Sequence, residues 1–68
     1  MFKIQYRNPQ GRMVTAQSFD RAEIKKLADK ARQDVPDPKV NELRVREIAA
    51  DEASGDFIWA ECTADFSR

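Results

Sequence analysis

The densest group of side chains that could do chemistry is a set of carboxylates around one turn. Glu47, Asp51, Glu52 and Asp56 fall within a ten-residue stretch. Carboxylates serve as general acids and bases and as calcium ligands. This spacing lacks the alternating ligands and central glycine of a calcium loop, and a turn at the rim of a small domain offers no pocket that holds two acids apart. We therefore expect a solvated polar turn here.

Other side chains that catalysis would need are scarce. The chain has no histidine, which is the commonest general base and a frequent metal ligand. Cys62 therefore lacks a histidine partner, and we expect its thiol to behave as a small buried hydrophobic group. The glycines are limited to Gly11 and Gly55, too few for a phosphate-binding loop. The sequence predicts a protein that is not an enzyme and uses no metal or cofactor, although a catalytic role within a larger assembly stays open.

Length and charge narrow the class of protein further. The 68 residues predict one domain, residues 1–68, with a thin core. Twelve basic and twelve acidic residues cancel, so bulk charge predicts no long-range attraction to nucleic acid or to a membrane. A lone cysteine and the lack of a signal-peptide pattern favour a cytoplasmic protein. The longest apolar run, Phe57–Ala60, is far shorter than the roughly 20 residues of a membrane span, so no membrane contact is expected.

The elements that must position any functional side chain begin with a β-hairpin. Residues 2–7 alternate between apolar and polar types, which predicts a half-buried strand, and residues 12–18 predict the second strand. The Asn-Pro-Gln-Gly segment between them is typical of a type I turn followed by a glycine bulge. A three-residue loop pairs Tyr6 with Val14, so that apolar side chains of both strands share one face.

A helix is predicted over residues 20–35. Asp20 is placed as the N-cap, and Glu23 three residues later would complete a capping box. Phe19 and Ile24 flank the cap at the spacing of a hydrophobic staple. Apolar residues then recur at helical spacing, and two prolines that follow should end the helix.

Two further strands are predicted over residues 40–49 and 56–64. In the first, the alternation places Ile48 on the outer face, so we expect a bulge near Glu47 to turn it inward. In the second, the even-numbered positions are apolar and mostly small, so we place them against the helix and turn the odd-numbered positions outward. The sequence does not fix the order of the strands.

These elements predict an α+β fold. We expect a two-layer ββαββ arrangement in which one helix covers one face of a four-stranded, mainly antiparallel sheet. Because a single helix covers only one face, the other must meet water or a partner. The residues of that face expected to contact a partner are Lys3, Arg7, Met13, Arg44, Arg46, Phe57 and Trp59.

Two functions suit such a face. Binding of another protein, or self-association as a homodimer, is favoured because Trp, Phe, Met and Arg are enriched at interface centres. The alternative is nucleic-acid binding, with aromatic rings stacked on bases and basic groups on phosphates, although Glu42 and Glu61 on the same face would repel phosphate. A third interpretation needs no partner: Phe57 and Trp59 lie under neighbouring arginine stems, or the phase of strand 56–64 is inverted and Trp59 is in the core.

Three segments together have a layout found in known small proteins: the strand Phe2–Arg7, the helix that begins after Ser18–Ala22, and the closing hairpin of Arg44–Arg46 with Phe57–Ala60. In organisation the chain resembles small α+β accessory proteins of phages, plasmids and other mobile elements, including some type I anti-CRISPR inhibitors. The resemblance implies an inhibitor that occupies a surface of a host nuclease complex without doing chemistry. The zero net charge argues against a DNA mimic. The contact candidates that the resemblance implies are Lys3, Arg7, Arg44 and Arg46.

Overall fold

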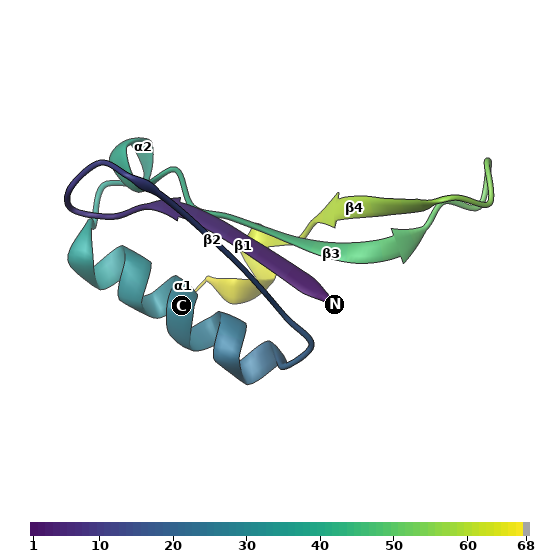
Figure 1. Ribbon diagram of the computed structural model, residues 1–68, viewed down its shortest axis with the longest axis horizontal. Coiled ribbons are helices and arrows are strands. Elements are labelled where there is room, and N and C mark those ends of the chain that lie inside the picture. Colours follow the sequence, from purple (N-terminus) through teal and green to yellow (C-terminus); the bar gives the residue numbers. More distant parts are fainter. Residues whose placement is uncertain (68) are drawn as a thin grey trace.

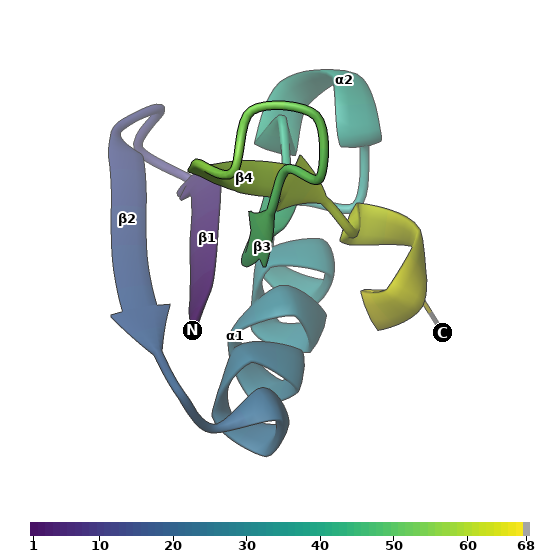
Figure 2. The same cartoon turned by 90° about the vertical axis from the view of Figure 1, so that its right-hand side faces the viewer.

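A four-stranded antiparallel sheet with one long helix on one side forms the body of the protein, as the computed structural model of residues 1–67 describes it (Figures 1 and 2). The elements are β1 (Phe2–Arg7), β2 (Met13–Ser18), α1 (Arg21–Asp34), α2 (Pro38–Asn41), β3 (Arg44–Ala50), β4 (Phe57–Glu61) and a short 3-10 helix, η1 (Thr63–Phe66). The strand order is β2-β1-β3-β4, and each neighbouring pair is antiparallel. The predicted α+β class with its ββαββ arrangement is confirmed.

The β1–β2 hairpin has the predicted register. Tyr6 pairs with Val14. Asn8 closes the loop, since its N–H donates to the carbonyl of Arg12 at 3.0 Å and its own carbonyl accepts from Gly11 at 2.9 Å. Gly11 has a φ of 79°, the left-handed conformation that the bulge requires. Turn chemistry and apolar alternation thus specify the same pairing.

The N-terminus of α1 has the predicted cap and a modified capping box. Asp20 accepts a hydrogen bond from the N–H of Ala22 at 2.9 Å. Ser18 stands between the two expected partners: its Oγ accepts from the N–H of Asp20 at 3.0 Å and donates to Glu23 at 2.9 Å. The expected hydrophobic staple is wrong, because Phe19 is 79% exposed.

One stripe of α1 packs on the sheet. Four of the residues that the helical spacing predicts lie on it, namely Ile24, Leu27, Ala28 and Ala31, whereas Val35 is the C-cap and follows the helix. The helix ends at Asp34, and the N–H of Val35 donates to the carbonyl of Ala31 at 3.0 Å. Pro36 follows directly, so the predicted stop is confirmed.

The connection from α1 to β3 differs from the prediction, which began a strand at residue 40. Residues Pro38–Asn41 instead form the single turn α2, and Glu42 after it takes a left-handed conformation with a φ of 50°. Asn41 fixes this connection although it is polar and only 1% exposed. Its amide donates to the carbonyl of Val35 at 2.8 Å and accepts from the N–H of Leu43 at 2.9 Å. β3 therefore starts at Arg44.

The pairing of β3 with β4 corrects a second expectation. It runs without interruption from Arg46 opposite Glu61 to Ala50 opposite Phe57, so the expected bulge near Glu47 is wrong. Ile48 faces outward, where it is 41% exposed. The predicted phase of the last strand is right, but β4 ends earlier than residue 64, and the chain turns into η1.

The core lies between α1, the middle of the sheet and η1. Its buried apolar side chains are Phe2, Ile4, Tyr6, Ile24, Ala28, Ala31, Val45 and Phe66.

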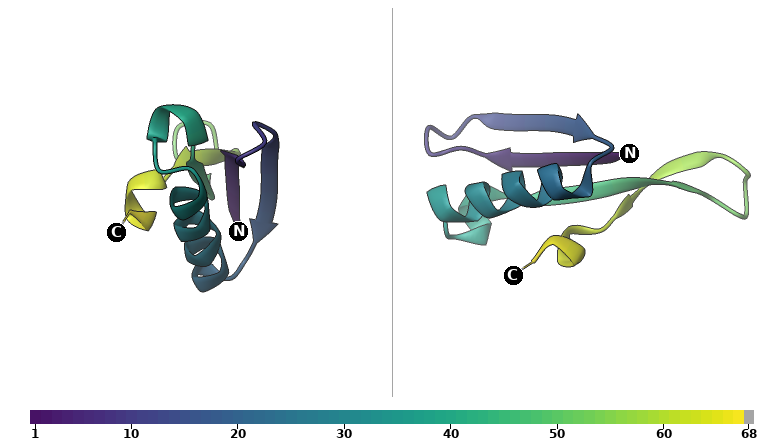
Figure 3. Two further views of the ribbon diagram at one scale, coloured as in Figure 1. Left: turned by 90° about the vertical axis from the view of Figure 1, so that its left-hand side faces the viewer. Right: turned by 90° about the horizontal axis from the view of Figure 1, so that it is seen from below.

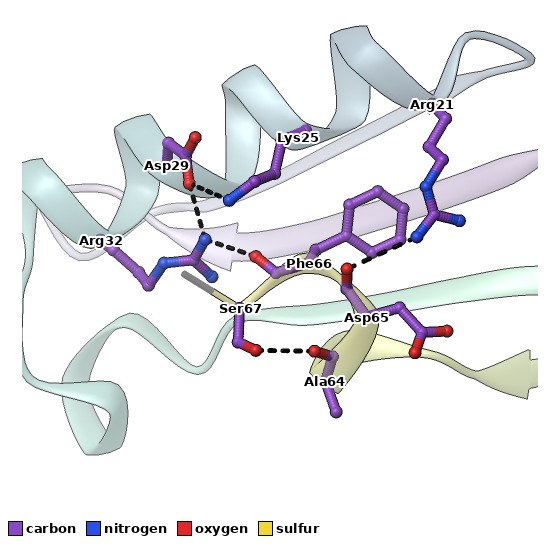
Figure 4. A network of polar contacts seen from close by, with 8 residues as sticks. All are labelled: Arg21, Lys25, Asp29, Arg32, Ala64, Asp65, Phe66 and Ser67. Atoms are coloured by element: carbon purple, nitrogen blue, oxygen red, sulfur yellow. Dashed lines mark hydrogen bonds and ion pairs between the residues drawn. The ribbon is translucent and has the colours of Figure 1, made fainter.

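The contribution of η1 to this core was not predicted. Phe66 is 1% exposed and meets Phe2 edge to face, with ring centroids 5.5 Å apart. The guanidinium of Arg21 lies 4.7 Å from the Phe66 ring centroid. Arg32 bridges α1 and η1, since it donates both to Asp29, at 2.8 Å, and to the carbonyl of Phe66 (Figure 4). The 3-10 helix is thus anchored to α1 by one aromatic ring and two arginines.

Beyond the body, the β3–β4 hairpin extends as an arm. Figure 3 shows it running past the start of β1 and past α1, and the molecule measures 39 × 21 × 18 Å. We call residues 48–58 the arm. No helix within residues 1–67 is both long enough and apolar enough to cross a membrane.

Candidate functional site

The sheet face opposite α1, here called the open face, collects every residue predicted for it. The register sets Lys3 beside Arg46, and Gln5 beside Arg44, on this side of the sheet. The residues of the open face are Lys3, Gln5, Arg7, Met13, Thr15, Gln17, Arg44, Arg46, Ile48, Phe57, Trp59 and Glu61.

Trp59 lies on this face and not in the core. The Nζ of Lys3 sits 4.7 Å from the centroid of its ring, within the range of a cation–π contact. This contact leaves the indole partly buried. The alternative in which the phase of β4 is inverted is therefore wrong.

Glu61 contacts both arginines at the centre of the face. One of its carboxylate oxygens lies 3.1 Å from Arg44 and 3.7 Å from Arg46. Its other oxygen accepts a hydrogen bond from the hydroxyl of Thr63 at 2.6 Å. That hydroxyl is the main cause of a lowered pKa of Glu61, and the arginines add to it. Glu61 thus offsets one of the two positive charges, and this part of the face remains basic.

Arg7 and Met13 lie at the opposite end of the open face. The guanidinium of Arg7 forms an ion pair with Glu42 and donates to the carbonyl of Gly11 at 2.9 Å. The register puts Arg7 eight residue positions from the level of Phe57, roughly 26 Å at the rise of a strand. The structure therefore brings Lys3, Arg44, Arg46 and Trp59 together but leaves Arg7 and Met13 apart from them.

The most exposed apolar group of the face lies on and beside the arm. Phe57 is 75% exposed, and Ile48, 41% exposed, is paired with Trp59 on the neighbouring strand. We call Ile48, Phe57 and Trp59 the distal patch. Ile48 was missing from the predicted site because of the expected bulge, and the unbroken alternation of Arg44, Arg46 and Ile48 was the signal that could have placed it there.

The thiol of Cys62 and the carboxylates of the acidic turn have surroundings that suit a structural role. Burial is the main reason why the pKa of the Cys62 thiol is raised, and Glu47 and Asp65 raise it further, so the thiol stays protonated at neutral pH. Asp51 organises its own turn by accepting from the N–H of Ala53 at 3.1 Å. Within residues 1–67 no three His, Cys, Asp or Glu side chains are grouped in a way that could hold a metal ion.

A recess of about 250 Å³ lies where the end of α1 meets α2 and η1. Its wall is mainly apolar and includes Pro36, Pro38 and Leu43. The charged group at its edge, Arg32, already donates to Asp29. The Arg32 nitrogen that donates to Asp29 is therefore already engaged, and the rest of the wall is mainly apolar.

The open face can bury apolar rings against a partner and surround them with Lys3, Arg44 and Arg46, of which the two arginines share the carboxylate of Glu61. Comparisons of the chain with protein-family models, with curated proteins and with solved structures find no match.

Proposed function

We propose that this chain is a small, non-catalytic, cytoplasmic accessory protein that binds protein through the distal patch of its open face. The observation that carries the proposal is the exposure of Phe57, at 75%, beside the partly covered Trp59. Exposed aromatic side chains that lie together on a small protein favour burial against a partner. Phe and Trp are also among the residue types that dominate the binding energy of interfaces.

The polar surroundings of the patch support a protein partner. Lys3 is engaged with the Trp59 ring, and Arg44 and Arg46 are engaged with Glu61. Interfaces between proteins commonly have an apolar centre surrounded by a polar rim. The partner that fits best has a mixed surface with an apolar centre.

Nucleic-acid binding receives less support from the same contacts. Phosphate binding needs cations that can leave their present partners, because affinity for nucleic acid comes from replacing counterions. Here Arg44 and Arg46 both lie against Glu61, whose carboxylate would oppose phosphate binding on this face. The aromatic rings suit base stacking, so this function remains the one to test against.

The proposed role is regulatory. The chain would act by occupying a surface on its partner, as the resemblance to inhibitors from mobile elements implies. Such action needs a stable surface and no reacting group, which agrees with the protonated Cys62 and with the structural role of Asp51 in its turn.

A cross-linking experiment with a matched control tests this function. A photoreactive phenylalanine analogue is placed at Phe57 in one variant and at Phe19 in the other, since the two rings are 75% and 79% exposed. In lysate of the cells that produce the protein, we expect defined protein adducts at position 57 that are lost on adding Trp59→Ala. Equal adducts at both positions, or none, would overturn the proposal.

The fluorescence of Trp59 distinguishes protein binding from the alternative, nucleic-acid binding. We expect titration with single-stranded DNA or RNA to leave the emission unchanged. A change that weakens steeply as salt is raised would favour nucleic acid instead.

A further inference from the structure

The arm extends beyond β1, because β3 pairs with β1 over only its first few residues. β3 pairs with β1 only as far as Glu47, which lies opposite Phe2, and the N–H of Ile48 makes the last contact, to the carbonyl of Met1 at 3.0 Å. From Ala49 to the turn, the hydrogen-bonded partner of β3 within residues 1–67 is β4 alone. In Figures 1 and 3 this part of the hairpin projects away from α1.

Both faces of the arm carry exposed apolar side chains. Ile48 and Phe57 lie on the open face, and Ile58, which is 46% exposed, lies on the other. An isolated two-stranded ribbon is only marginally stable in water, and it gains stability from a further strand or from a packing surface. The arm thus needs a neighbour that the body of its own chain does not provide.

The outer edge of β4 is set to receive a strand. The N–H of Asp51 donates to the carbonyl of Asp56 at 2.7 Å, and the N–H of Cys62 donates to the carbonyl of Val45 at 2.8 Å. The direction of the backbone N–H and C=O groups alternates along an antiparallel strand. In β4 the backbone groups of the even-numbered residues therefore point toward β3. The residues whose backbone groups point outward are therefore Phe57, Trp59 and Glu61.

We propose that the occupant of this edge is a second copy of this chain, paired antiparallel through β4 about a two-fold axis at Trp59. The two sheets then join into one continuous eight-stranded sheet. Trp59 lies opposite Trp59 of the second copy, and Phe57 lies opposite Glu61 of the second copy. This inference rests on the proposed protein-binding function and names the partner of the same distal patch.

The distribution of charge favours the antiparallel orientation of this pair over a parallel one. Residues 47–67 carry six acidic side chains and no basic one, whereas residues 1–46 carry eleven basic and six acidic side chains. Antiparallel pairing brings the acidic turn of each arm, which contains Asp56, toward η1 of the other copy, where Asp65 is acidic and the guanidinium of Arg21 lies over Phe66. The two Asp56 residues are then about 20 Å apart, about two and a half Debye lengths at physiological salt. Parallel pairing would instead place the two acidic turns together.

The other edge of the sheet is a poorer candidate. β2 presents Thr15 and Gln17 on the open face, so a strand added there would bury mainly polar side chains. β4 presents Phe57 and Trp59 at the corresponding places. The two edges therefore supply matched positions for an experiment.

The first test is the mass of the protein in solution. Light scattering after size exclusion should give twice the mass of one chain for the wild type and for Phe19→Ser. Phe57→Ser should raise the dissociation constant of the dimer at least tenfold, with an unchanged circular dichroism spectrum. A monomeric wild type, or equal weakening by both substitutions, would overturn the proposal.

The second test traps the register. In a Cys62→Ser background, Trp59→Cys should form a disulfide-linked dimer with oxidised glutathione, because Cα atoms of a hydrogen-bonded antiparallel pair are about 5.5 Å apart and disulfides span roughly 4.4–6.8 Å. Thr15→Cys in the same background should form no disulfide link, because β2 lies at the other edge of the sheet. Cross-linking at Thr15 in place of Trp59 would refute the β4 interface. A monomer that still gives foreign adducts at Phe57 would end this inference and leave the proposed function standing.

Discussion

Replacing Phe66 by alanine should unfold most of the protein, although this residue lies in a single turn of 3-10 helix near the end of the described chain. Its ring is 1% exposed and packs against Phe2 at 5.5 Å and under Arg21 at 4.7 Å. Removal leaves a cavity between α1 and β1 that the short 3-10 helix cannot fill. We therefore treat η1 as part of the core and not as a tail.

The size of the effect follows from burial. Truncation of a fully buried phenylalanine to alanine costs about 3–5 kcal/mol. A domain of this length is expected to have a total unfolding free energy of roughly 3–10 kcal/mol. Phe66→Ala should thus remove most of the stability, whereas Phe66→Leu, which retains most of the volume, should cost about 1 kcal/mol.

Urea denaturation followed by Trp59 fluorescence and far-ultraviolet circular dichroism measures both variants at one protein concentration. With a slope near 1 kcal/mol per molar urea, Phe66→Leu should lower the midpoint by about 1 M, and Phe66→Ala should be largely unfolded without urea. Phe19→Ala is the matched control and should change the free energy by less than about 0.5 kcal/mol, because its ring is 79% exposed. If Phe66→Ala were as stable as Phe19→Ala, the assignment of η1 to the core would be wrong.

Two further predictions concern polar groups. Asn41→Ala should lower the unfolding free energy by about 1–3 kcal/mol, because it leaves two backbone groups beside α2 without their partner, and urea denaturation checks this. Glu61→Gln keeps an acceptor for Thr63 but removes the charge beside Arg44, so at neutral pH it should cost about 1 kcal/mol or less for an exposed ion pair. Since the pKa of Glu61 is lowered in the folded protein, the stabilisation is complete above the ordinary glutamate range and is lost as the pH falls through the lowered value. Denaturation curves across acidic pH should therefore converge for wild type and Glu61→Gln, and a gap that stays constant would contradict the assignment.

Local chemistry made the first half of the fold predictable. The turn at Asn8–Gly11 permits one loop length, and the apolar alternation of β1 and β2 independently requires the same register. Asp20 and the prolines after Val35 likewise mark the two ends of α1 by their own hydrogen bonds and ring geometry. Where two local signals agreed, the structure followed them.

The elements that the sequence did not predict depend on contacts between distant residues. α2 has only four residues and is held by Asn41, whose two hydrogen bonds reach both flanking segments. η1 is held in place by the contact of Phe66 with Phe2, which lies more than sixty residues earlier in the chain. No periodic pattern in the sequence predicts such a contact. Elements as short as α2 and η1 contain too few residues for a periodic pattern, so the sequence alone does not identify them.

The sequence predicted most residues of the candidate site. It did not predict how Glu61 contacts the arginines or that Ile48 belongs to the site. The alternation of β1, β3 and β4 was enough to place Lys3, Arg46 and Trp59 on one face. The contacts of Glu61 with Arg44 and Arg46 depend on the register of β3 against β4, which the sequence did not reveal. The omission of Ile48 came from the assumption that this residue must face the helix, which required a bulge near Glu47.

That assumption fails for a physical reason that also bears on the dimer. The run Phe57–Ala60 is apolar on both faces of β4, a pattern typical of strands covered on both sides. In the single chain, α1 does not extend under the arm, and Phe57 and Ile58 remain 75% and 46% exposed. Pairing of β4 with β4 of a second copy would extend the sheet beside these residues and bring the aromatic rings of two distal patches together. A strand apolar on both sides at the edge of a sheet is therefore better explained by an assembled state than by the folding of one chain.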